Sequence, residues 1–163
     1  MIYLVTRNRQ LFKSEYYEII SLEKSIEIIK SWDLIQFDTE TSGRDPHVCK
    51  ILCAQFGNRK AGIQIVVDTS TIDICNYRSL LETKLIVGHN LKFDIQFLYN
   101  HDIIPENCWD TMIIEQLLHL GFNNKFFHYS LKDVAERRLK IDIDKTTRGE
   151  IIWRGLDDKV VLY

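Results

Sequence analysis

Two carboxylates lie close together at the end of an apolar stretch of the chain. Asp38 and Glu40 follow residues 34–37, whose composition is typical of a buried β-strand. Because side chains alternate along a strand, positions i and i+2 point to one face, so both carboxylates face the same way. Adjacent carboxylates repel each other, and a cation between them relieves that repulsion. A bare Asp-x-Glu also occurs as a solvated pair in a loop, so further residues are needed to decide.

A third carboxylate comes from the segment VGHNLKFD, residues 87–94. The segment predicts a strand that ends in a turn at Gly88, followed by a helix that carries Asn90 and Asp94 on one face. Such a helix can aim Asp94 at the pair on the strand. Three hard oxygen ligands favour Mg²⁺ or Mn²⁺ over zinc. An asparagine four residues before an aspartate is also a common capping arrangement, and this alternative stays open.

The cysteines point to no metal site of their own. Cys49, Cys53, Cys75 and Cys108 form no Cys-x-x-Cys pair and no Cys/His spacing typical of zinc. They are expected to be reduced thiols in a cytoplasmic protein. The N-terminus lacks the apolar core of a signal peptide, and no apolar run is long enough for a membrane span, so no membrane partner is expected.

Length and charge narrow the class of protein further. A chain of 163 residues with 45% hydrophobic content predicts one domain over residues 1–163. The 21 basic residues nearly balance the 23 acidic ones, which excludes the strongly basic face of a duplex-binding protein. If nucleic acid is the ligand, bound metal ions must supply much of the local positive charge.

The elements that position these residues follow from hydrophobic periodicity. Strands are predicted at 2–5, 34–38, 48–56, 63–67 and 85–87, and helices after Ser21 and at 91–99, 111–120 and 130–139. Three successive strands favour an antiparallel meander, and the later strand and helices favour parallel additions. The sequence therefore predicts an α/β fold with a mixed β-sheet flanked by α-helices.

Together, FDTET at 37–41 and GHNLKFD at 88–94 resemble the first two motifs of the DEDD (DnaQ-like) 3′-5′ exonuclease superfamily. The similarity to the proofreading domain of bacterial and phage family A DNA polymerases continues through SLKDVAERRLK to the end of the chain. It covers residues 34–163. The resemblance implies a ribonuclease H-like fold and hydrolysis of phosphodiester bonds at 3′ ends by a two-metal mechanism.

The resemblance also assigns roles within the site. It implies that Asp38, Glu40 and Asp94 hold two divalent ions, Mg²⁺ or Mn²⁺. Tyr163 matches the tyrosine of the family's third motif, YxxxD, which orients the attacking water. The aspartate of that motif is expected just beyond Tyr163, so the domain is expected to be C-terminally incomplete. Asp157 or Asp158 is an alternative donor of the fourth carboxylate.

Four residues are expected to bind the substrate. Thr41 and Arg44 follow the first motif and are placed to contact the terminal nucleotide, although a solvated loop arginine also fits Arg44. Asn90 is expected to support the site or the bound terminus. His89 is placed to touch phosphate, with a local hydrogen bond as the alternative. Residues 126–129 are aromatic or histidine and either stack an unpaired base or pack in the core.

The expected substrate is a single-stranded 3′ end of DNA, in bacterial or phage replication. A polymerase domain, or a separate chain that supplies the missing aspartate, is the expected partner. Two alternatives remain. An RNA-trimming exonuclease resembling ribonuclease D uses the same acidic cage, and a catalytically impaired nucleic-acid-binding or docking module follows if the fourth carboxylate is missing.

Overall fold

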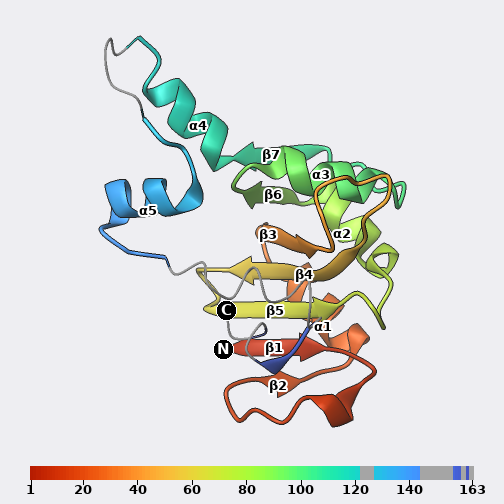
Figure 1. Cartoon of the computed structure of the whole chain (residues 1–163). Coiled ribbons are helices and arrows are strands. Elements are labelled where there is room, and N and C mark those ends of the chain that lie inside the picture. The colour runs from red at the N-terminus through yellow and green to blue at the C-terminus, as the bar shows by residue number, and fades with distance from the viewer. Residues whose placement is uncertain (122–126, 144–155, 159–160, 162–163) are drawn as a thin grey trace.

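The computed structural model describes residues 1–121, 127–143, 156–158 and 161, and its described strands form one sheet (Figure 1). The seven strands lie in the order β2-β1-β5-β4-β3-β6-β7. They are β1 (Ile2–Val5), β2 (Glu18–Ile19), β3 (Leu34–Thr41), β4 (Ile51–Asn58), β5 (Ile63–Asp68), β6 (Leu85–Gly88) and β7 (Asn107–Asp110).

Strand direction confirms the predicted mixed sheet. β4 pairs antiparallel with both β3 and β5, which is the expected meander. β6 runs parallel to β3, and β7 runs parallel to β6. On the other side, β1 runs parallel to β5 and to β2. The expected parallel additions are therefore present on both edges of the meander, and the short strands β2 and β7 are additions that periodicity did not predict.

Five α-helices and two short 3₁₀ helices complete the described secondary structure. They are η1 (Arg9–Leu11), α1 (Leu22–Lys30), η2 (Ile74–Tyr77), α2 (Arg78–Thr83), α3 (Leu91–Tyr99), α4 (Thr111–Leu118) and α5 (Leu131–Leu139). The predicted caps at Ser21 and Ser130 are confirmed, since each hydroxyl accepts a backbone N–H three residues on, at 3.1 Å and 3.3 Å. The helix at 91–99 has the predicted bounds.

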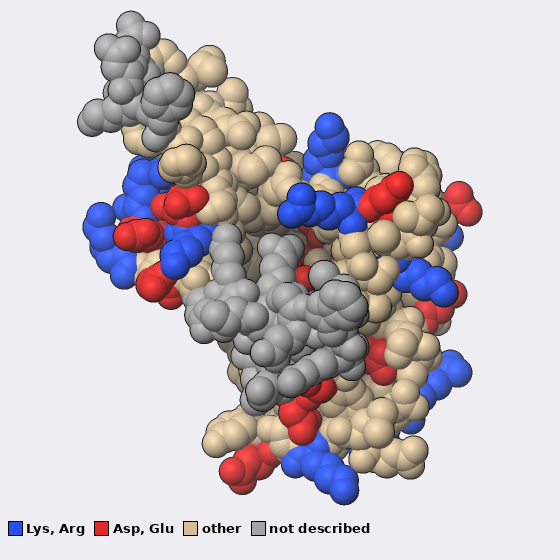
Figure 2. Space-filling view, in the orientation of Figure 1, with Lys and Arg blue, Asp and Glu red and all other residues tan. Residues whose placement is uncertain are grey.

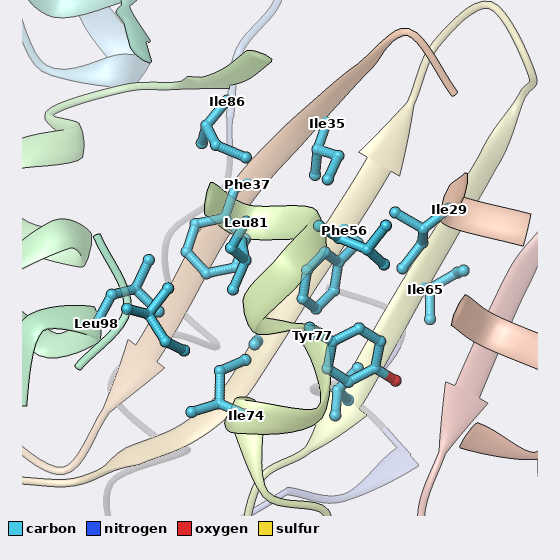
Figure 3. Packing of buried hydrophobic residues seen from close by; sticks show 14 of the residues in the cluster. Ile29, Ile35, Phe37, Phe56, Ile65, Ile74, Tyr77, Leu81, Ile86 and Leu98 are labelled. Carbon is cyan, nitrogen blue, oxygen red and sulfur yellow. The ribbon is translucent and has the colours of Figure 1, made fainter. Parts of the chain in front are cut away.

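The main core lies between one face of the sheet and α1, α2 and α3 (Figure 3). Phe37 and Phe56 from neighbouring strands meet edge to face with ring centroids 5.3 Å apart, and Tyr77 packs on Phe56 at 4.8 Å. The buried Tyr77 hydroxyl shares a 2.7 Å hydrogen bond with Ser25 of α1. Helix and strand are thus joined by packing that leaves the tyrosine oxygen satisfied.

A smaller apolar cluster covers the other face of the sheet. It is formed by Leu4, Phe12, Tyr17, Cys53, Val66 and Val161. Side chains alternate along β4, so Cys53 faces this cluster while its neighbour Ala54 belongs to the main core. Among the described residues, no helix is long and apolar enough to cross a membrane.

In Figure 1, α4 lies beyond the β7 edge of the sheet, and α5 lies beside the ends of the strands. The two helices contact each other through charged side chains. The buried Glu115 of α4 accepts hydrogen bonds from Arg137 at 3.0 Å and from Arg138 at 2.6 Å, both on α5. Figure 2 shows basic and acidic side chains together over α5. Burial favours the neutral form of Glu115, but hydrogen bonds and charge from Arg138 and Arg137 hold the pKa of Glu115 below its ordinary value.

Candidate functional site

The end of β3 carries the first two carboxylates of the site. Glu40 is buried and Asp38 is half-buried. In the sheet register, Asp38 lies opposite Gln55 and Glu40 lies opposite Cys53, which puts both on the face away from the main core. A β-bulge between Glu40 and Thr41 ends the regular pairing there. The strand therefore presents the pair as its alternation predicted.

The thiol of Cys53, on β4, is affected by the negative charges of Glu40 and Asp38. Burial, and then the charges of Glu40 and Asp38, raise the pKa of the Cys53 thiol to about 12. The thiol is fully buried, so it stays protonated at neutral pH. Both carboxylates consequently lie close enough to act on one atom of the neighbouring strand.

Asp94 of α3 joins the pair through Thr39. The backbone N–H and the hydroxyl of Thr39 both donate to Oδ1 of Asp94, at 2.9 Å and 2.6 Å. Thr39 lies between Asp38 and Glu40 in sequence and points to the opposite face, toward the helices. These two hydrogen bonds fix the start of α3 against the end of β3.

Burial and the charge of Asp38 both act on Asp94. Asp94 is 3% exposed, and burial together with the charge of Asp38 raises the pKa of Asp94 to about 7. The hydrogen bonds from Thr39 oppose this shift. A cation relieves the repulsion between a buried acid and a neighbouring like charge, and carboxylates supply hard oxygen donors. Asp38, Glu40 and Asp94, called the acidic cage below, are therefore the residues that would hold a divalent ion of the Mg²⁺ type.

The turn between β6 and α3 needs two unusual backbone positions. A Cβ on Gly88 would lie 2.5 Å from Leu91 and 2.8 Å from the carbonyl oxygen of Phe37, so only glycine allows this close approach. Asn90 adopts the left-handed region with φ 63°, which asparagine tolerates well. The Asn90 side chain makes no capping hydrogen bond to α3, contrary to the capping alternative. The backbone N–H of Asn90 donates to Oδ1 of Asp110 at 3.0 Å.

His89 is held from both sides by the protein. Its Nδ1 lies 3.0 Å from the hydroxyl of Thr111, and its Nε2 lies 2.8 Å from the carbonyl of Tyr129. The structure thus shows the local hydrogen bonds weighed from the sequence. A contact between His89 and phosphate requires one of them to open.

The other predicted substrate residues lie in or near the loop after β3. The buried Thr41 hydroxyl donates to the carbonyl of Gly43 at 2.6 Å, whereas Arg44 is exposed in that loop. The carboxylate of Asp158 accepts a hydrogen bond from the hydroxyl of Tyr17. Tyr163 lies outside the described residues.

Part of the aromatic segment before α5 packs inside the protein. The Phe127 ring lies 4.0 Å from the ring of His119, and the Arg137 guanidinium lies 5.5 Å from the Phe127 centroid. These contacts agree with packing against α4 and α5. Phe126 lies outside the described residues.

Thr39 is the contributor that sequence reasoning missed. Its position between two acidic residues draws attention to its neighbours, and its role appears only once α3 lies across the strand. The alternation of the strand carries a usable signal, because a polar side chain on the helix-facing side needs a partner there. Asp110 is a second omission, since it caps α4 and holds the turn at Asn90.

Comparisons with known proteins agree with the resemblance seen in the sequence. A family model described as a 3′-5′ exonuclease matches residues 16–150. DNA polymerase I of Aquifex aeolicus (strain VF5) is 34% identical over 126 residues, which are 77% of this chain and 20% of that protein. The chain thus spans about a fifth of the length of the curated relative it matches.

Solved structures share the fold. Escherichia coli RNase D gives a TM-score of 0.70 at 16% identity, covering 98% of this chain and 39% of the other. Brucella melitensis NrnC with bound Mg²⁺ gives 0.67 at 17% identity, covering 99% and 71%. At these identities the likeness establishes the fold, which confirms the predicted ribonuclease H-like architecture.

Proposed function

Because this chain belongs to the 3′-5′ exonuclease family, we propose that it removes nucleotides from single-stranded 3′ ends of DNA, as a proofreading exonuclease does. The observation that carries the proposal is the buried Asp94 beside Asp38, with a pKa raised to about 7 by burial and by that neighbouring charge. Such an acid, built into a family of metal-dependent exonucleases, is suited to holding divalent ions.

In this proposal Asp38, Glu40 and Asp94 hold the ions. When bound, divalent ions lower the pKa of the attacking water and stabilise the leaving 3′ oxygen. Thr39 keeps Oδ1 of Asp94 in a fixed direction through its two hydrogen bonds. Mg²⁺ is the proposed ion, with Mn²⁺ as a substitute, because the donors are carboxylate oxygens.

The remaining predicted residues take positioning roles in the same proposal. Asn90 has a side chain that is not used for capping, so it is free to orient the 3′ terminus. Thr41 and Arg44 approach the terminal nucleotide from the loop after β3. His89 reaches phosphate by giving up its bond to Thr111 or to Tyr129. Tyr163 is proposed to orient the water.

DNA is favoured over RNA by the 34% identity with a DNA polymerase I. Escherichia coli RNase D, an exoribonuclease involved in structured RNA processing, resembles the chain only in fold, at 16% identity. A polymerase region, on the same or a separate chain, is the proposed partner. The proposed location is the cytoplasm of a bacterial or phage-infected cell.

The test is degradation of a 5′-labelled DNA strand with a 3′ overhang, beside an RNA strand of the same sequence, in Mg²⁺ or Mn²⁺. Stepwise shortening of DNA that Asp38→Ala/Glu40→Ala abolishes is expected. Glu27→Gln, an exposed carboxylate paired with Lys24 on α1, is the matched control and should cleave like the wild type.

Each other outcome overturns a defined part of the proposal. Faster shortening of RNA than of DNA would show that RNA is the substrate. Binding of 3′ ends without cleavage in either metal would show that the chain is a nucleic-acid-binding module and not an enzyme. Cleavage by the double variant would show that Asp38 and Glu40 are not needed for the reaction.

A further inference from the structure

A second group of metal-type donors lies outside the acidic cage. Asp73, Cys75 and His101 bring a carboxylate oxygen, a thiol sulfur and an imidazole nitrogen within 4.8 Å of one another. Asp73 and Cys75 belong to the start of η2, and His101 follows α3 in the turn that leads toward β7. The side chains are half-buried or exposed, so an ion in solvent can reach all three.

The backbone around these donors is fixed by hydrogen bonds. Oδ1 of Asp73 accepts the N–H of Cys75 at 2.8 Å, which holds the carboxylate beside the thiol. The N–H of His101 donates to the carbonyl of Leu98 at 2.9 Å and continues the C-terminal turn of α3. The thiol of Cys75 points to the His101 carbonyl, with 3.7 Å between sulfur and oxygen.

We propose that Asp73, Cys75 and His101 bind one divalent cation of borderline softness, such as Zn²⁺. Thiolate sulfur and imidazole nitrogen are the ligands that select such ions, whereas the carboxylates of the acidic cage select Mg²⁺ or Mn²⁺. Three protein ligands leave a fourth zinc position to water, whereas structural zinc sites usually have four protein ligands, so weaker binding than at those sites is expected.

The distances allow the site to close with small side-chain rotations. Bonds of about 2.0–2.3 Å to zinc put tetrahedral ligands about 3.3–3.8 Å apart. Donor atoms that lie within 4.8 Å of one another must therefore approach by about 1.5 Å at most. Side-chain rotations can supply movements of this size.

Binding exchanges a proton for the ion. The thiol of Cys75 must lose its proton to the solvent as sulfur binds the metal, and its hydrogen bond to the His101 carbonyl is given up. Burial, together with the hydrogen bond and charge of Asp73, holds the pKa of the Cys75 thiol above its ordinary value. Affinity for the ion should accordingly rise with pH.

Arg78 acts on the site in two ways. Its Nη2 lies 4.0 Å from the sulfur of Cys75 and 2.7 Å from the carbonyl oxygen of His101. The positive charge opposes the approach of a cation but also favours the thiolate form of Cys75. Because Arg78 already joins α2 to the turn after α3, a bound ion would reinforce a contact that the fold makes anyway.

The site is proposed to stabilise the fold and does not take part in catalysis. It would tie η2 to the turn after α3, two segments that lie 26 residues apart between Cys75 and His101. An ion that binds only the folded chain raises its stability by mass action. This inference stands independently of the exonuclease proposal.

The test is titration of the full chain with Co²⁺ alone, after treatment with a chelator and a reductant. Absorption from cobalt–thiolate charge transfer is specific to a bound sulfur, so the oxygen donors of the acidic cage do not produce it. We expect saturation at one ion per chain and displacement by Zn²⁺. Zn²⁺ should also raise the thermal midpoint of the same protein.

Substitutions decide whether the signal comes from this site. Cys75→Ser should abolish the charge-transfer absorption, and His101→Gln should weaken Co²⁺ binding by about tenfold or more. Cys108→Ser is the matched control, because Cys108 is an exposed thiol near Asp110 that belongs to no such three-donor group among the described residues. It should bind Co²⁺ like the wild type.

Three results would overturn the proposal. The first is the absence of thiolate absorption in wild type, and the second is its persistence in Cys75→Ser. The third is its loss in Cys108→Ser. Circular dichroism of each variant separates loss of the site from loss of the fold, and Asp73→Asn, which can still cap η2, gives a second variant should Cys75→Ser not fold.

Discussion

Asp94 and Glu115 are both buried carboxylates on helices, but their charged neighbours differ in sign. Asp94 has a negative neighbour and Glu115 has positive ones. Asp94 lies beside Asp38, and its pKa is raised to about 7 by burial and then by that charge. Glu115 lies between Arg137 and Arg138, and its pKa is lowered although burial opposes the change. The pKa of a buried carboxylate is therefore raised or lowered according to the sign of the charges beside it.

The difference separates a structural acid from a functional one. Glu115 has cationic partners within the protein, at 3.0 Å and 2.6 Å, and needs no ligand. Asp94 has two hydrogen bonds from Thr39 and a like charge close by, so it gains from a cation supplied from outside. Perturbed acids of the second kind mark functional sites more reliably than their burial alone.

The largest expected effect is on catalysis. Asp94→Asn should lower cleavage of a single-stranded DNA 3′ end by about 1,000-fold or more, because it removes one charged ligand of the ions. Glu115→Gln should leave the rate per folded molecule nearly unchanged. Cleavage is measured in single-turnover assays at saturating Mg²⁺. Equal losses of cleavage rate in Asp94→Asn and Glu115→Gln would show that the two acids do not differ in their role in catalysis.

The two acids should also respond to pH in opposite windows. The folded pKa of Asp94, about 7, lies above its ordinary value of 3.8, so its contribution to stability is complete below about pH 4 and is lost as pH rises through about 7. The folded pKa of Glu115 lies below 4.5, so its contribution is present above that value and is lost only as pH falls below it.

Between about pH 5 and about pH 8, therefore, Asp94 changes and Glu115 does not. Metal-free protein should lose about 2–4 kcal/mol of unfolding free energy through Asp94 over this range. Urea unfolding in a chelator at both pH values measures the loss, and Asp94→Asn is the reference that lacks it. An identical pH dependence in wild type and variant would show that Asp94 is ionised without penalty.

Glu115→Gln should destabilise the contact between α4 and α5. The substitution removes the charge that Arg137 and Arg138 share, at a cost of about 1–3 kcal/mol. Urea unfolding at neutral pH measures this cost. Glu136→Gln, an exposed carboxylate on α5, is the control and should change stability by less than about 0.5 kcal/mol. A stable Glu115→Gln variant would mean that the arginines find other partners.

Thr39→Val should give the smallest of these effects. It removes the hydroxyl hydrogen bond to Asp94 and keeps the backbone one. Divalent-ion affinity is expected to fall by about tenfold, measured as the Mg²⁺ concentration for half-maximal cleavage. Thr69→Val is the matched control, because its hydroxyl binds the carbonyl of Ile51 instead of an acid. An unchanged Mg²⁺ requirement would show that the backbone N–H alone orients Asp94.

Strong periodicity made most of the fold predictable from the sequence. The helix at 91–99 and the meander of β3, β4 and β5 follow from apolar spacing and turn residues, and the starts of α1 and α5 follow from capping serines. The two-residue β2 and the four-residue β7 were not predicted, because strands so short carry almost no alternation. Their pairing is imposed by neighbouring strands.

The candidate site was predictable where local spacing defines it. Asp38 and Glu40 share a face because of strand alternation, and Asp94 follows from the helix start after Gly88. The partner of Thr39 and the partners of His89 were not predictable, since their contacts join segments between 22 and 55 residues apart. Only the folded arrangement brings such residues together, and the Asp73, Cys75 and His101 group is another example.

The pairing of β1 with β5 has a consequence for the order of folding. Ile2 lies opposite Gln64, and the N-terminal ammonium of Met1 donates to the carbonyl of Gly62 at 2.6 Å. Pairing β1 with β5 closes the loop between Ile2 and Gln64, which costs more chain entropy than pairing the adjacent strands of the meander. We therefore expect β1, the N-terminal strand, to join the sheet late. In pulse-labelled hydrogen exchange during refolding, β4 amides should gain protection before β1 amides. Simultaneous protection would contradict this order.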